Sequence, residues 1–436
     1  MKILHYSLGF PPYRSGGLTK YCVDLMLTQV EQGNEVALLW PGRITKFNGK
    51  TKIRKKKDWK GIENLELINP LPVSLDEGIL NIDAYTKSTD KTVYLNFLEN
   101  YLPNVIHVHT LMGLHKEFMQ AANQLGIRTV FTTHDYFGIC PKVILYHDGD
   151  VCDEDHGCSD CVNCNQSALS LKKIIVMQSM LYRNLKDTKV VKILRRQHRQ
   201  KFFEDSVSKI AELKDSQNTA QDYKKLREYY ISILETIDFI HFNSSLAENI
   251  YKKYMTPKDS KMVSITHSDI KDNRNNVHIN SSKLRILYLA PPKPYKGYNV
   301  LIQALDELWE SGFTNFILKV FSPVKKMTDY MVVQDMGYNY NDLPIIFSNA
   351  DVLVAPSIWY ETFGFTVLEA LSFGVPVIVS DHVGAKDIIG NSGEIVKAGN
   401  VHELKSVIKN FHYKKSNEPV KKWEDFVKEN YLLYKK

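Results

Sequence analysis

The stretch at residues 351–380, DVLVAPSIWYETFGFTVLEALSFGVPVIVS, has the pattern of one strand–helix–strand unit. Two apolar runs, VLVA and VPVIV, lie at its two ends and are typical of buried strands. Between them Phe365, Leu368 and Leu371 recur at a spacing of three, which indicates a helix, and Gly374 follows where a left-handed C-terminal cap is expected. The stretch therefore predicts an α/β fold built from such units.

Two carboxylates flank this helix, Glu361 in the loop before it and Glu369 eight residues later. Eight helical residues rise about 12 Å, so the pair suits a ligand with polar groups at both ends and a charged middle. The start of the helix offers unpaired N–H groups and a positive dipole end for a diphosphate. The residues there are Phe363, Gly364, Phe365 and Thr366. A nucleotide sugar has this layout, with Glu361 at the sugar hydroxyls and Glu369 at the ribose.

Two glutamates at this spacing also occur by chance in many helices, so the surrounding pattern decides. It is PS-x3-ETFG-x4-EAL-x2-G-x-PV-x3-D. This pattern resembles the signature of retaining glycosyltransferases of family GT4, with the E-x7-E motif at Glu361 and Glu369. The resemblance implies a GT-B fold, in which two Rossmann-like domains with parallel sheets face a central cleft. It also implies a nucleotide-sugar donor and no catalytic metal.

The amino-terminal end predicts a second unit of the same kind. A short buried strand at 2–6 is followed by a loop that ends in Gly16 and Gly17, a helix at about 18–32 and a strand at 35–40. A glycine pair most often marks a plain turn. At this place it resembles the GG loop of GT4 enzymes, whose glycines let the backbone approach the donor diphosphate or the acceptor.

Two histidines follow predicted strands at about 104–109 and 128–133. His109 and His134 are expected at the carboxyl ends of these strands, the edge where open α/β sheets bind ligands. A histidine there is as often a hydrogen-bonded structural group as a functional one. The run TTHDY resembles the GT4 segment whose histidine reaches the transferred sugar, which implies that His134 orients the donor or stabilises the transition state, with Asp135 positioning it.

Five of the six cysteines fall between residues 140 and 164. The four that are closest to a metal-ligand spacing are Cys152, Cys158, Cys161 and Cys164. In a cytosolic protein such spacing favours metal thiolates over disulfides, so a structural zinc ion is one expectation, reduced thiols a second, and a disulfide or a metal cluster a third. A site here would brace a lid beside the acceptor opening rather than perform the chemistry.

A helical insert is expected at 167–233, where Gly and Pro are absent. Its first half is basic and amphipathic, so it suits an anionic membrane surface. The alternative is a helical hairpin whose apolar face packs on the domain and whose charges are solvated. No motif that reads nucleic acid accompanies the charge, so a nucleic-acid partner is not expected.

The second domain opens at Leu284 with a strand, a proline-rich turn and a helix. The Lys-Gly pair in the turn resembles the GT4 segment G-R-x4-KG, whose Arg and Lys bind the donor diphosphate. Lys296 matches, whereas Pro291 stands at the position of the Arg and Lys293 is the nearby substitute. Lys and Arg are not equivalent at bidentate phosphate contacts, so this departure predicts weaker stabilisation of the leaving group.

The 436 residues suffice for two or three domains. The predicted division is 1–270 for an acceptor domain that carries the Cys-rich loop 140–164 and the helical insert, 271–283 for a linker, 284–415 for a nucleotide-sugar domain, and 416–436 for a helix that crosses back to the first domain. No signal peptide or membrane span is expected, which predicts a cytoplasmic protein, peripheral at the inner face of the cell membrane if the basic helix binds lipid. A net charge of +7 is compatible with an anionic partner.

The resulting prediction is a retaining glycosyltransferase that moves a hexose from a UDP- or GDP-sugar to a hydroxyl of a glycan or lipid-linked acceptor, in surface polysaccharide (capsule) biosynthesis. Glu361 and His134 are the expected catalytic residues. The rival is a weakened GT-B protein that serves as a nucleotide-sugar-binding or partner subunit, which the missing Arg favours. A metal-dependent enzyme that uses the cysteines is a third reading, and it requires activity to vanish with chelators while the fold survives.

Overall fold

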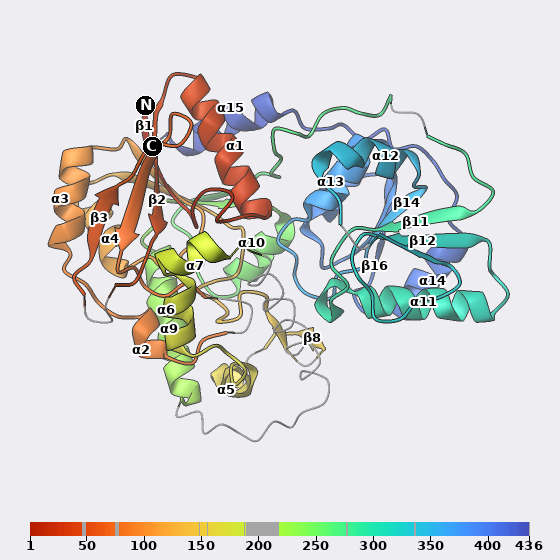
Figure 1. Cartoon of the computed structure of the whole chain (residues 1–436), viewed down its shortest axis with the longest axis horizontal. Helices are drawn as coiled ribbons and strands as arrows, with labels where there is room; N and C mark the ends of the chain where they lie inside the picture. The colour runs from red at the N-terminus through yellow and green to blue at the C-terminus, as the bar shows by residue number, and fades with distance from the viewer. Residues whose placement is uncertain are drawn as a thin grey trace.

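The computed structural model describes residues 1–45, 49–74, 78–147, 149–154, 156–186, 188, 218–275, 278–334 and 337–435. Two α/β domains stand side by side, and each is built on its own mainly parallel sheet (Figure 1). The predicted fold class is thereby confirmed.

The first sheet has eight strands in the order β10-β9-β6-β5-β1-β2-β4-β3, and only β3 is antiparallel to its neighbour. Its strands are β1 (Lys2–Tyr6), β2 (Glu35–Pro41), β3 (Lys52–Lys55), β4 (Glu63–Ile68), β5 (Val105–Val108), β6 (Arg128–Thr132), β9 (Phe239–Phe242) and β10 (Ser260–Met262). The central strands are almost fully buried, as expected for a parallel sheet covered by helices on both faces.

The helices of the first domain are α1 (Gly17–Glu31), α2 (Ile82–Tyr85), α3 (Thr92–Tyr101), α4 (Lys116–Gln124), α5 (Ser159–Cys164), α6 (Leu171–Met177), α7 (Met180–Leu185), α9 (Ala220–Leu234) and α10 (Ser245–Lys252). Local sequence sets several of their starts. Thr219 and Asp222 form a capping box at α9, and the Ser244 hydroxyl caps α10. A small hairpin of β7 (Tyr146–His147) and β8 (Asp150–Val151) precedes α5.

The second sheet is wholly parallel, in the order β13-β12-β11-β14-β15-β16. Its strands are β11 (Leu284–Tyr288), β12 (Phe316–Val320), β13 (Met331–Val333), β14 (Val352–Ala355), β15 (Val377–Ser380) and β16 (Gly393–Val396). Its helices are α11 (Tyr298–Glu310), α12 (Leu343–Ser348), α13 (Phe365–Ser372) and α14 (Val401–Lys409). The predicted strand–helix–strand unit around α13 is therefore present.

The last helix, α15 (Trp423–Leu433), returns to the first domain and lies near α1 (Figure 1). The Trp423 indole donates to Thr28 of α1 at 2.8 Å. One apolar cluster runs without a break from α1 through α13 to α15, with members such as Tyr21, Val367 and Phe426. The two domains consequently share part of their core.

Two charged stretches of the sequence contain regular structure. The basic run at 43–60 contains β3, which pairs with β4, and Ile53 of β3 packs against the core. The predicted helical insert at 167–233 contains α6 and α7, which are separated at Gln178, and α9. Most of the predicted basic face of this insert, at 187 and 189–217, lies outside the described residues.

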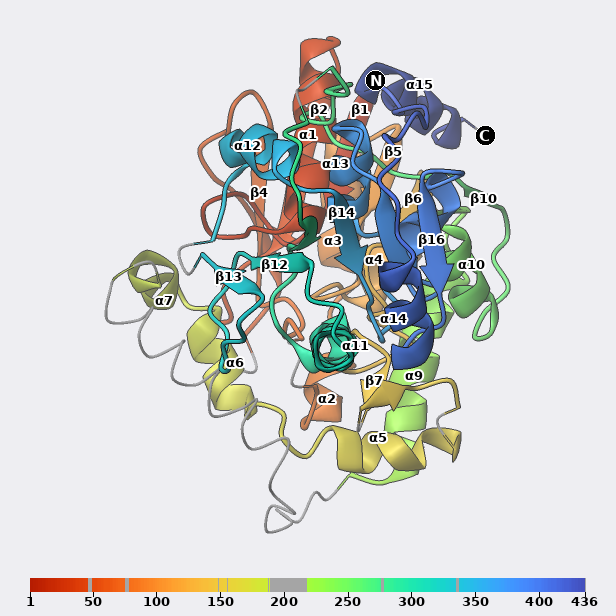
Figure 2. The same ribbon diagram turned by 90° about the vertical axis from the view of Figure 1, so that its right-hand side faces the viewer.

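In Figure 2, α6 and α7 project from the edge of the first domain, away from α15. Among the described helices, none combines the length and the apolar composition needed to cross a bilayer.

Candidate active site

The topology of both sheets defines where a ligand should bind. The order β4-β2-β1-β5-β6-β9 in the first sheet and the full order of the second are those of doubly wound sheets, in which the strand order reverses between two central strands. The reversal lies between β1 and β5 in one domain and between β11 and β14 in the other. The loops that follow these four strands carry Gly16 and Gly17, His109, Lys296, and Glu361, respectively. Most of the predicted site residues thus fall at the two crevices.

Glu361 and Lys296 form an ion pair between the loops after β14 and β11. The Lys296 ammonium donates to Glu361 Oε1 at 2.8 Å, and the Ser357 hydroxyl donates to Oε2 at 2.7 Å. The ammonium also lies 4.6 Å from the centre of the Trp359 ring. Both charged side chains keep some exposure, 16% for Lys296 and 21% for Glu361, so a ligand can reach them.

The surroundings of Glu361 keep its carboxylate ionised. Burial works to raise its pKa, but the charge of Lys296 and the hydrogen bonds from Lys296 and Ser357 outweigh that effect and lower the pKa below its ordinary value. Glu361 is therefore an acceptor for hydroxyl groups at neutral pH.

Gly297 allows the two loops to approach this closely. Its φ is +73°, and a Cβ at this position would lie 1.8 Å from the carbonyl oxygen of Pro356. The backbone next to Lys296 therefore lies directly against Pro356, the residue between β14 and Ser357.

The N-terminus of α13 presents free donors next to this pair. Gly364 precedes the helix with φ +107°, and within the described structure the N–H groups of Gly364, Phe365 and Thr366 have no hydrogen-bond partner. The side chain of Phe363 is buried, and its carbonyl accepts from Ala385. Free N–H groups at a helix start suit an anion such as a phosphate.

Glu369 lies on α13, nearly fully buried at 4% exposure. His267 Nε2 is 3.6 Å from its Oε1, and the hydroxyl of Tyr340 hydrogen-bonds to the same carboxylate. His267 packs edge-on against Phe365, with ring centres 5.2 Å apart. A carboxylate held among rings at the far end of a helix suits the hydroxyls of a nucleoside.

The glycine loop of the first domain meets α13 across the domain boundary. Gly16 has φ +106° and begins α1, and a Cβ on Gly17 would lie 3.1 Å from the Phe365 ring. The structure thus brings the predicted GG loop and the predicted anion-binding helix start to the same place.

His134 reaches the same region from the end of β6. The Thr362 hydroxyl donates to the His134 carbonyl at 3.0 Å, and the His134 ring lies 4.7 Å from that of Tyr21. Burial lowers the pKa of His134 to about 3, so the ring is neutral. Asp135 does not contact the His134 ring, because its carboxylate accepts from Phe137 N–H and from Thr110.

The Cys-rich loop also touches the second domain. The Tyr360 hydroxyl donates to the Asp153 carboxylate, and the rings of Tyr146 and Tyr295 lie 5.9 Å apart. Lys253 of the first domain holds Asp153 from the other side at 3.3 Å. The loop therefore borders the Lys296–Glu361 pair, as the lid prediction requires.

The predicted zinc ligands are not assembled as a ligand set. No disulfide joins Cys152, Cys158, Cys161 or Cys164. Among the described residues, the groups that bring three ligand atoms within 4.8 Å of one another contain none of these four. The thiols of Cys158 and Cys161 hydrogen-bond to each other instead, which lowers the pKa of Cys158. A structural zinc here stays a prediction for metal analysis.

Pro291 stands at the position of the missing arginine, and its backbone carbonyl takes part in a hydrogen bond. The Pro291 carbonyl accepts from Tyr288, and the Lys293 ammonium donates to the Tyr295 hydroxyl at 2.5 Å. Lys293 therefore points to Tyr295, and Lys296 is the cation that pairs with Glu361.

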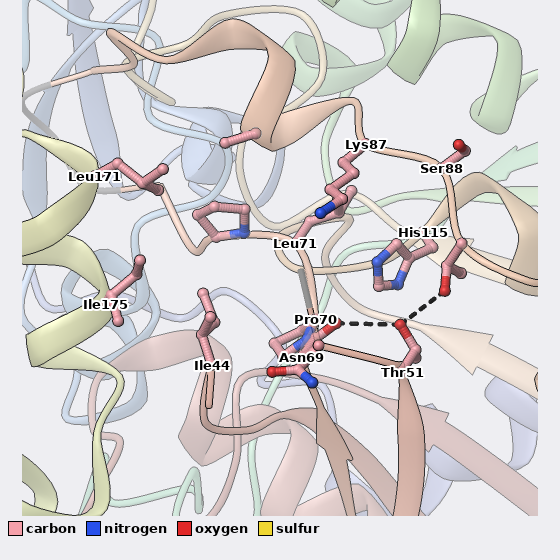
Figure 3. A pocket seen from close by; sticks show the side chains of 14 residues that line it. Ile44, Thr51, Asn69, Pro70, Leu71, Lys87, Ser88, His115, Leu171 and Ile175 are labelled. Carbon is pink, nitrogen blue, oxygen red and sulfur yellow. Dashed lines mark hydrogen bonds between the residues drawn. The ribbon is translucent and has the colours of Figure 1, made fainter. Parts of the chain in front are cut away.

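A separate pocket lies in the first domain, at the end of β4 (Figure 3). Thr51, Asn69, Lys87 and His115 supply its polar lining, and Leu171 of α6 closes one side. Its volume of about 50 Å³ is far below the roughly 300 Å³ of small-molecule sites, and none of its lining residues belongs to the crevices described above. It therefore does not hold a nucleotide sugar.

Sequence reasoning missed the groups that connect the two crevices. Thr362 was part of the matched pattern, yet its hydrogen bond to His134 depends on how the domains pack. His267 lies near the end of the predicted first domain, shortly before the linker, and is 1% exposed beside Glu369. Ser357 and Thr362 both belong to the matched pattern, in its PS pair and its ETFG segment, but the pattern does not indicate their contacts.

Comparison with known proteins agrees with this architecture. Residues 269–429 match the family model of glycosyl transferases group 1. An O-antigen chain mannosyltransferase B of Escherichia coli is 36% identical over 134 residues, which cover 28% of this chain and 35% of that protein. An uncharacterized glycosyltransferase of Methanocaldococcus jannaschii is 26% identical over 186 residues, covering 37% of this chain and 46% of that protein. The chain thus spans less than half the length of these relatives.

The solved structures extend the similarity to the whole chain. A sucrose-phosphate synthase of Thermosynechococcus elongatus has a TM-score of 0.57 at 14% identity and covers 99% of this chain and 98% of its own. The catalytic domain of starch synthase IV from Arabidopsis thaliana, bound to ADP and acarbose, has a TM-score of 0.53 at 12% identity with coverage of 99% and 98%. At such identities the similarity shows the fold, which is GT-B. Residues 269–429 thus match the group 1 glycosyltransferases in sequence, and the whole chain has the GT-B fold.

Proposed function

We propose that this protein is a retaining hexosyltransferase that binds a nucleoside-diphosphate sugar between its two domains and transfers the hexose to a hydroxyl of a glycan or lipid-linked acceptor. The observation that carries the proposal is the Lys296–Glu361 pair beside the free N–H groups at the start of α13, with Glu369 on the same helix. These three features lie in the order of a sugar, a diphosphate and a ribose.

In this proposal the diphosphate is held by Lys296 and by the N–H groups of Gly364, Phe365 and Thr366. Departure of the nucleoside diphosphate builds negative charge on its terminal phosphate, and these fixed donors stabilise that charge as it forms. The ammonium makes only one bond to Glu361, so its remaining N–H groups are available to phosphate oxygens. No metal ion is needed for this stabilisation.

Glu361 would orient the sugar, because its ionised carboxylate accepts hydrogen bonds from vicinal hydroxyls. His134, neutral at the end of β6, would bind the sugar from the opposite domain and help stabilise the oxocarbenium-like centre. The GG loop, Gly16 and Gly17, leaves room for the backbone to approach the donor. Attack by the acceptor on the leaving-group face would retain the configuration.

The relatives support a role in surface polysaccharide biosynthesis. One is an O-antigen chain mannosyltransferase of Escherichia coli, and another is an uncharacterized 41.2 kDa protein in the cps region of Klebsiella pneumoniae, 28% identical over 138 residues. The acceptor would then be a growing glycan, and the donor a UDP- or GDP-hexose.

Turnover of donor sugars by Glu361→Ala tests the proposal. The wild type should release nucleoside diphosphate from one UDP- or GDP-hexose, and Glu361→Ala should lose that release by at least about 100-fold, as typical for an electrostatic contact at the reacting centre. Glu394→Ala, an exposed glutamate of β16, is the matched control. Donor binding without turnover in the wild type would favour the rival, a nucleotide-sugar-binding partner subunit, as the absence of the Arg at Pro291 suggests.

We also propose that α6 and α7 bring the enzyme to an anionic membrane surface, where lipid-linked acceptors reside. Four large apolar side chains within ten residues are between 42% and 70% exposed; they are Val176, Met180, Leu181 and Leu185. Lys172 and Lys173 are exposed beside them. Apolar side chains next to lysines suit the interface of a bilayer that contains anionic lipids.

Sedimentation with lipid vesicles tests this surface. The wild type should sediment with vesicles that contain phosphatidylglycerol. Leu181→Ser should lower the sedimented fraction more than Ile345→Ser, the control, which alters an equally exposed residue on α12 of the other domain. Equal retention of both variants would instead favour a solvated helical hairpin. In either case the protein would work on the cytoplasmic side.

A further inference from the structure

Four histidines and a buried cysteine lie close together in the centre of the first domain. Among the described residues, two triplets bring their ligand atoms within 4.8 Å of one another. One triplet is His5, His107 and His109, on the adjacent strands β1 and β5. The other is Cys22, His109 and His134. The ring nitrogens of His5 and His107 have hydrogen-bond partners, whereas two nitrogens of the second triplet have none. Only the second triplet is therefore a candidate ligand site.

The first triplet is already satisfied. Both ring nitrogens of His5 and both of His107 lie within 2.9 Å of a hydrogen-bond partner; the partners are Gln29, His109, Thr132 and Tyr434. No lone pair of His5 or His107 is left for an ion, so this triplet is a structural hydrogen-bond network that joins the sheet to α1 and to the end of the chain.

This network fixes the proton positions on His109. The Gln29 amide nitrogen donates to the Tyr434 hydroxyl at 3.0 Å, so the Gln29 oxygen faces His5 and must accept from His5 Nε2. His5 Nδ1 is then a lone pair, which accepts from His109 Nε2 at 2.9 Å. His109 donates its Nε2 proton in this bond, and a neutral imidazole carries one proton only. His109 Nδ1 therefore carries a lone pair.

That lone pair has no hydrogen-bond partner, although His109 is fully buried. His134 Nε2 is likewise buried and without a partner. A buried polar atom without a partner destabilises the fold, so a bound species is expected between the two nitrogens. The thiol of Cys22, on the buried face of α1, completes the triplet.

We propose that Cys22 Sγ, His109 Nδ1 and His134 Nε2 bind one zinc-class divalent cation. A thiolate with two imidazoles is a ligand set of intermediate softness, which zinc prefers. Bonds of about 2.0–2.3 Å require ligand pairs about 3.3–3.8 Å apart, so the side chains would close inward by about 1 Å. The hydrogen bond from His109 Nε2–H to His5 is the kind of support that orients metal-bound imidazoles.

The ion would tie together three parts of the domain that border the cleft: the helix after the GG loop, the end of β5 and the end of β6. Both ligand nitrogens are buried, so the ion would lie inside the domain. Metal binding must displace the Cys22 proton, because the thiolate is the form that binds zinc. The cation would fix the orientation of His134, and the proposal does not depend on the transfer reaction.

Metal analysis of the untagged full-length chain tests the proposal, since a polyhistidine tag would bind the same ions. After loading with zinc and dialysis, mass spectrometry should find one ion per chain that Cys22→Ala loses. The control replaces the other candidate ligands, Cys152, Cys158, Cys161 and Cys164, by Ser; it should keep the ion. Loss of the ion from this control, retention by Cys22→Ala, or a wild type without metal would each overturn the proposal, the last pointing to a buried water.

X-ray absorption at the zinc edge of the wild type covers the case in which Cys22→Ala does not fold. The proposal predicts one sulfur and two imidazole nitrogens around the ion. Four sulfurs would place the ion in the Cys-rich loop and overturn it. Zinc should also raise the thermal midpoint of the wild type and leave that of Cys22→Ala unchanged.

Discussion

Gly297→Ala should destabilise the second domain far more than the addition of one methyl group suggests. With φ at +73°, any residue with a Cβ is strained by about 1–2 kcal/mol. The new Cβ would also lie 1.8 Å from the Pro356 carbonyl oxygen, so one of the two loops must move, at an expected cost of about 1–3 kcal/mol. Together these effects predict a loss of about 2–5 kcal/mol in the free energy of unfolding.

Gly312→Ala is the matched control for this prediction. Its φ is +86°, but a Cβ there meets nothing within 4 Å, so only the conformational cost of about 1–2 kcal/mol applies. Urea unfolding, followed by tryptophan fluorescence, should place the midpoint of Gly297→Ala below that of Gly312→Ala. Nucleotide affinity should fall only in Gly297→Ala, because its shift displaces Lys296 and Ser357. Equal midpoints and equal affinities would refute the close packing of the two loops.

Three further outcomes follow from the described contacts. Lys296→Met should weaken binding of a nucleoside diphosphate by about 10- to 100-fold in calorimetry, since a charge-assisted hydrogen bond contributes roughly 1.5–3 kcal/mol. Burial raises the pKa of Asp135 from 3.8 to about 6, so the folded state favours the protonated form; stability should fall by up to about 3 kcal/mol as pH rises from 4 to 6, and unfolding of Asp135→Asn should lack this slope. Tyr434→Phe leaves buried groups of Gln29 and His107 without a partner and should lower the free energy of unfolding by about 2–4 kcal/mol; a thermal midpoint like that of the wild type would contradict the network.

The sequence was sufficient for the strands and helices near the candidate site, because their patterns are local. The strand at β11 and the helix at α11 begin and end where the apolar spacing predicts. The strand–helix–strand unit around Glu361 and Glu369 is equally regular, since Gly364 and Gly374, both with positive φ, delimit the helix.

What the sequence could not predict depends on contacts between distant segments. His267 stands in a polar run of the sequence, so the sequence does not predict its burial. It is buried because α13 and the ring of Tyr340 pack around it. The basic run with β3 carries no strand pattern of its own, and pairing with β4 determines its structure. Likewise, cysteine spacing alone suggested a zinc site in one loop, whereas the atoms that converge come from α1, β5 and β6.

The most direct test of the account is calorimetric binding of UDP, GDP and ADP, with their hexose conjugates, to the wild type and to Glu369→Ala. The account predicts that one nucleotide binds the wild type, and that Glu369→Ala binds it at least about 10-fold more weakly because the ribose loses its buried acceptor. Glu394→Ala, exposed on β16, should bind as the wild type does. Absence of binding to the wild type, or equal binding to Glu369→Ala, would contradict the claim that this cleft holds a nucleotide sugar.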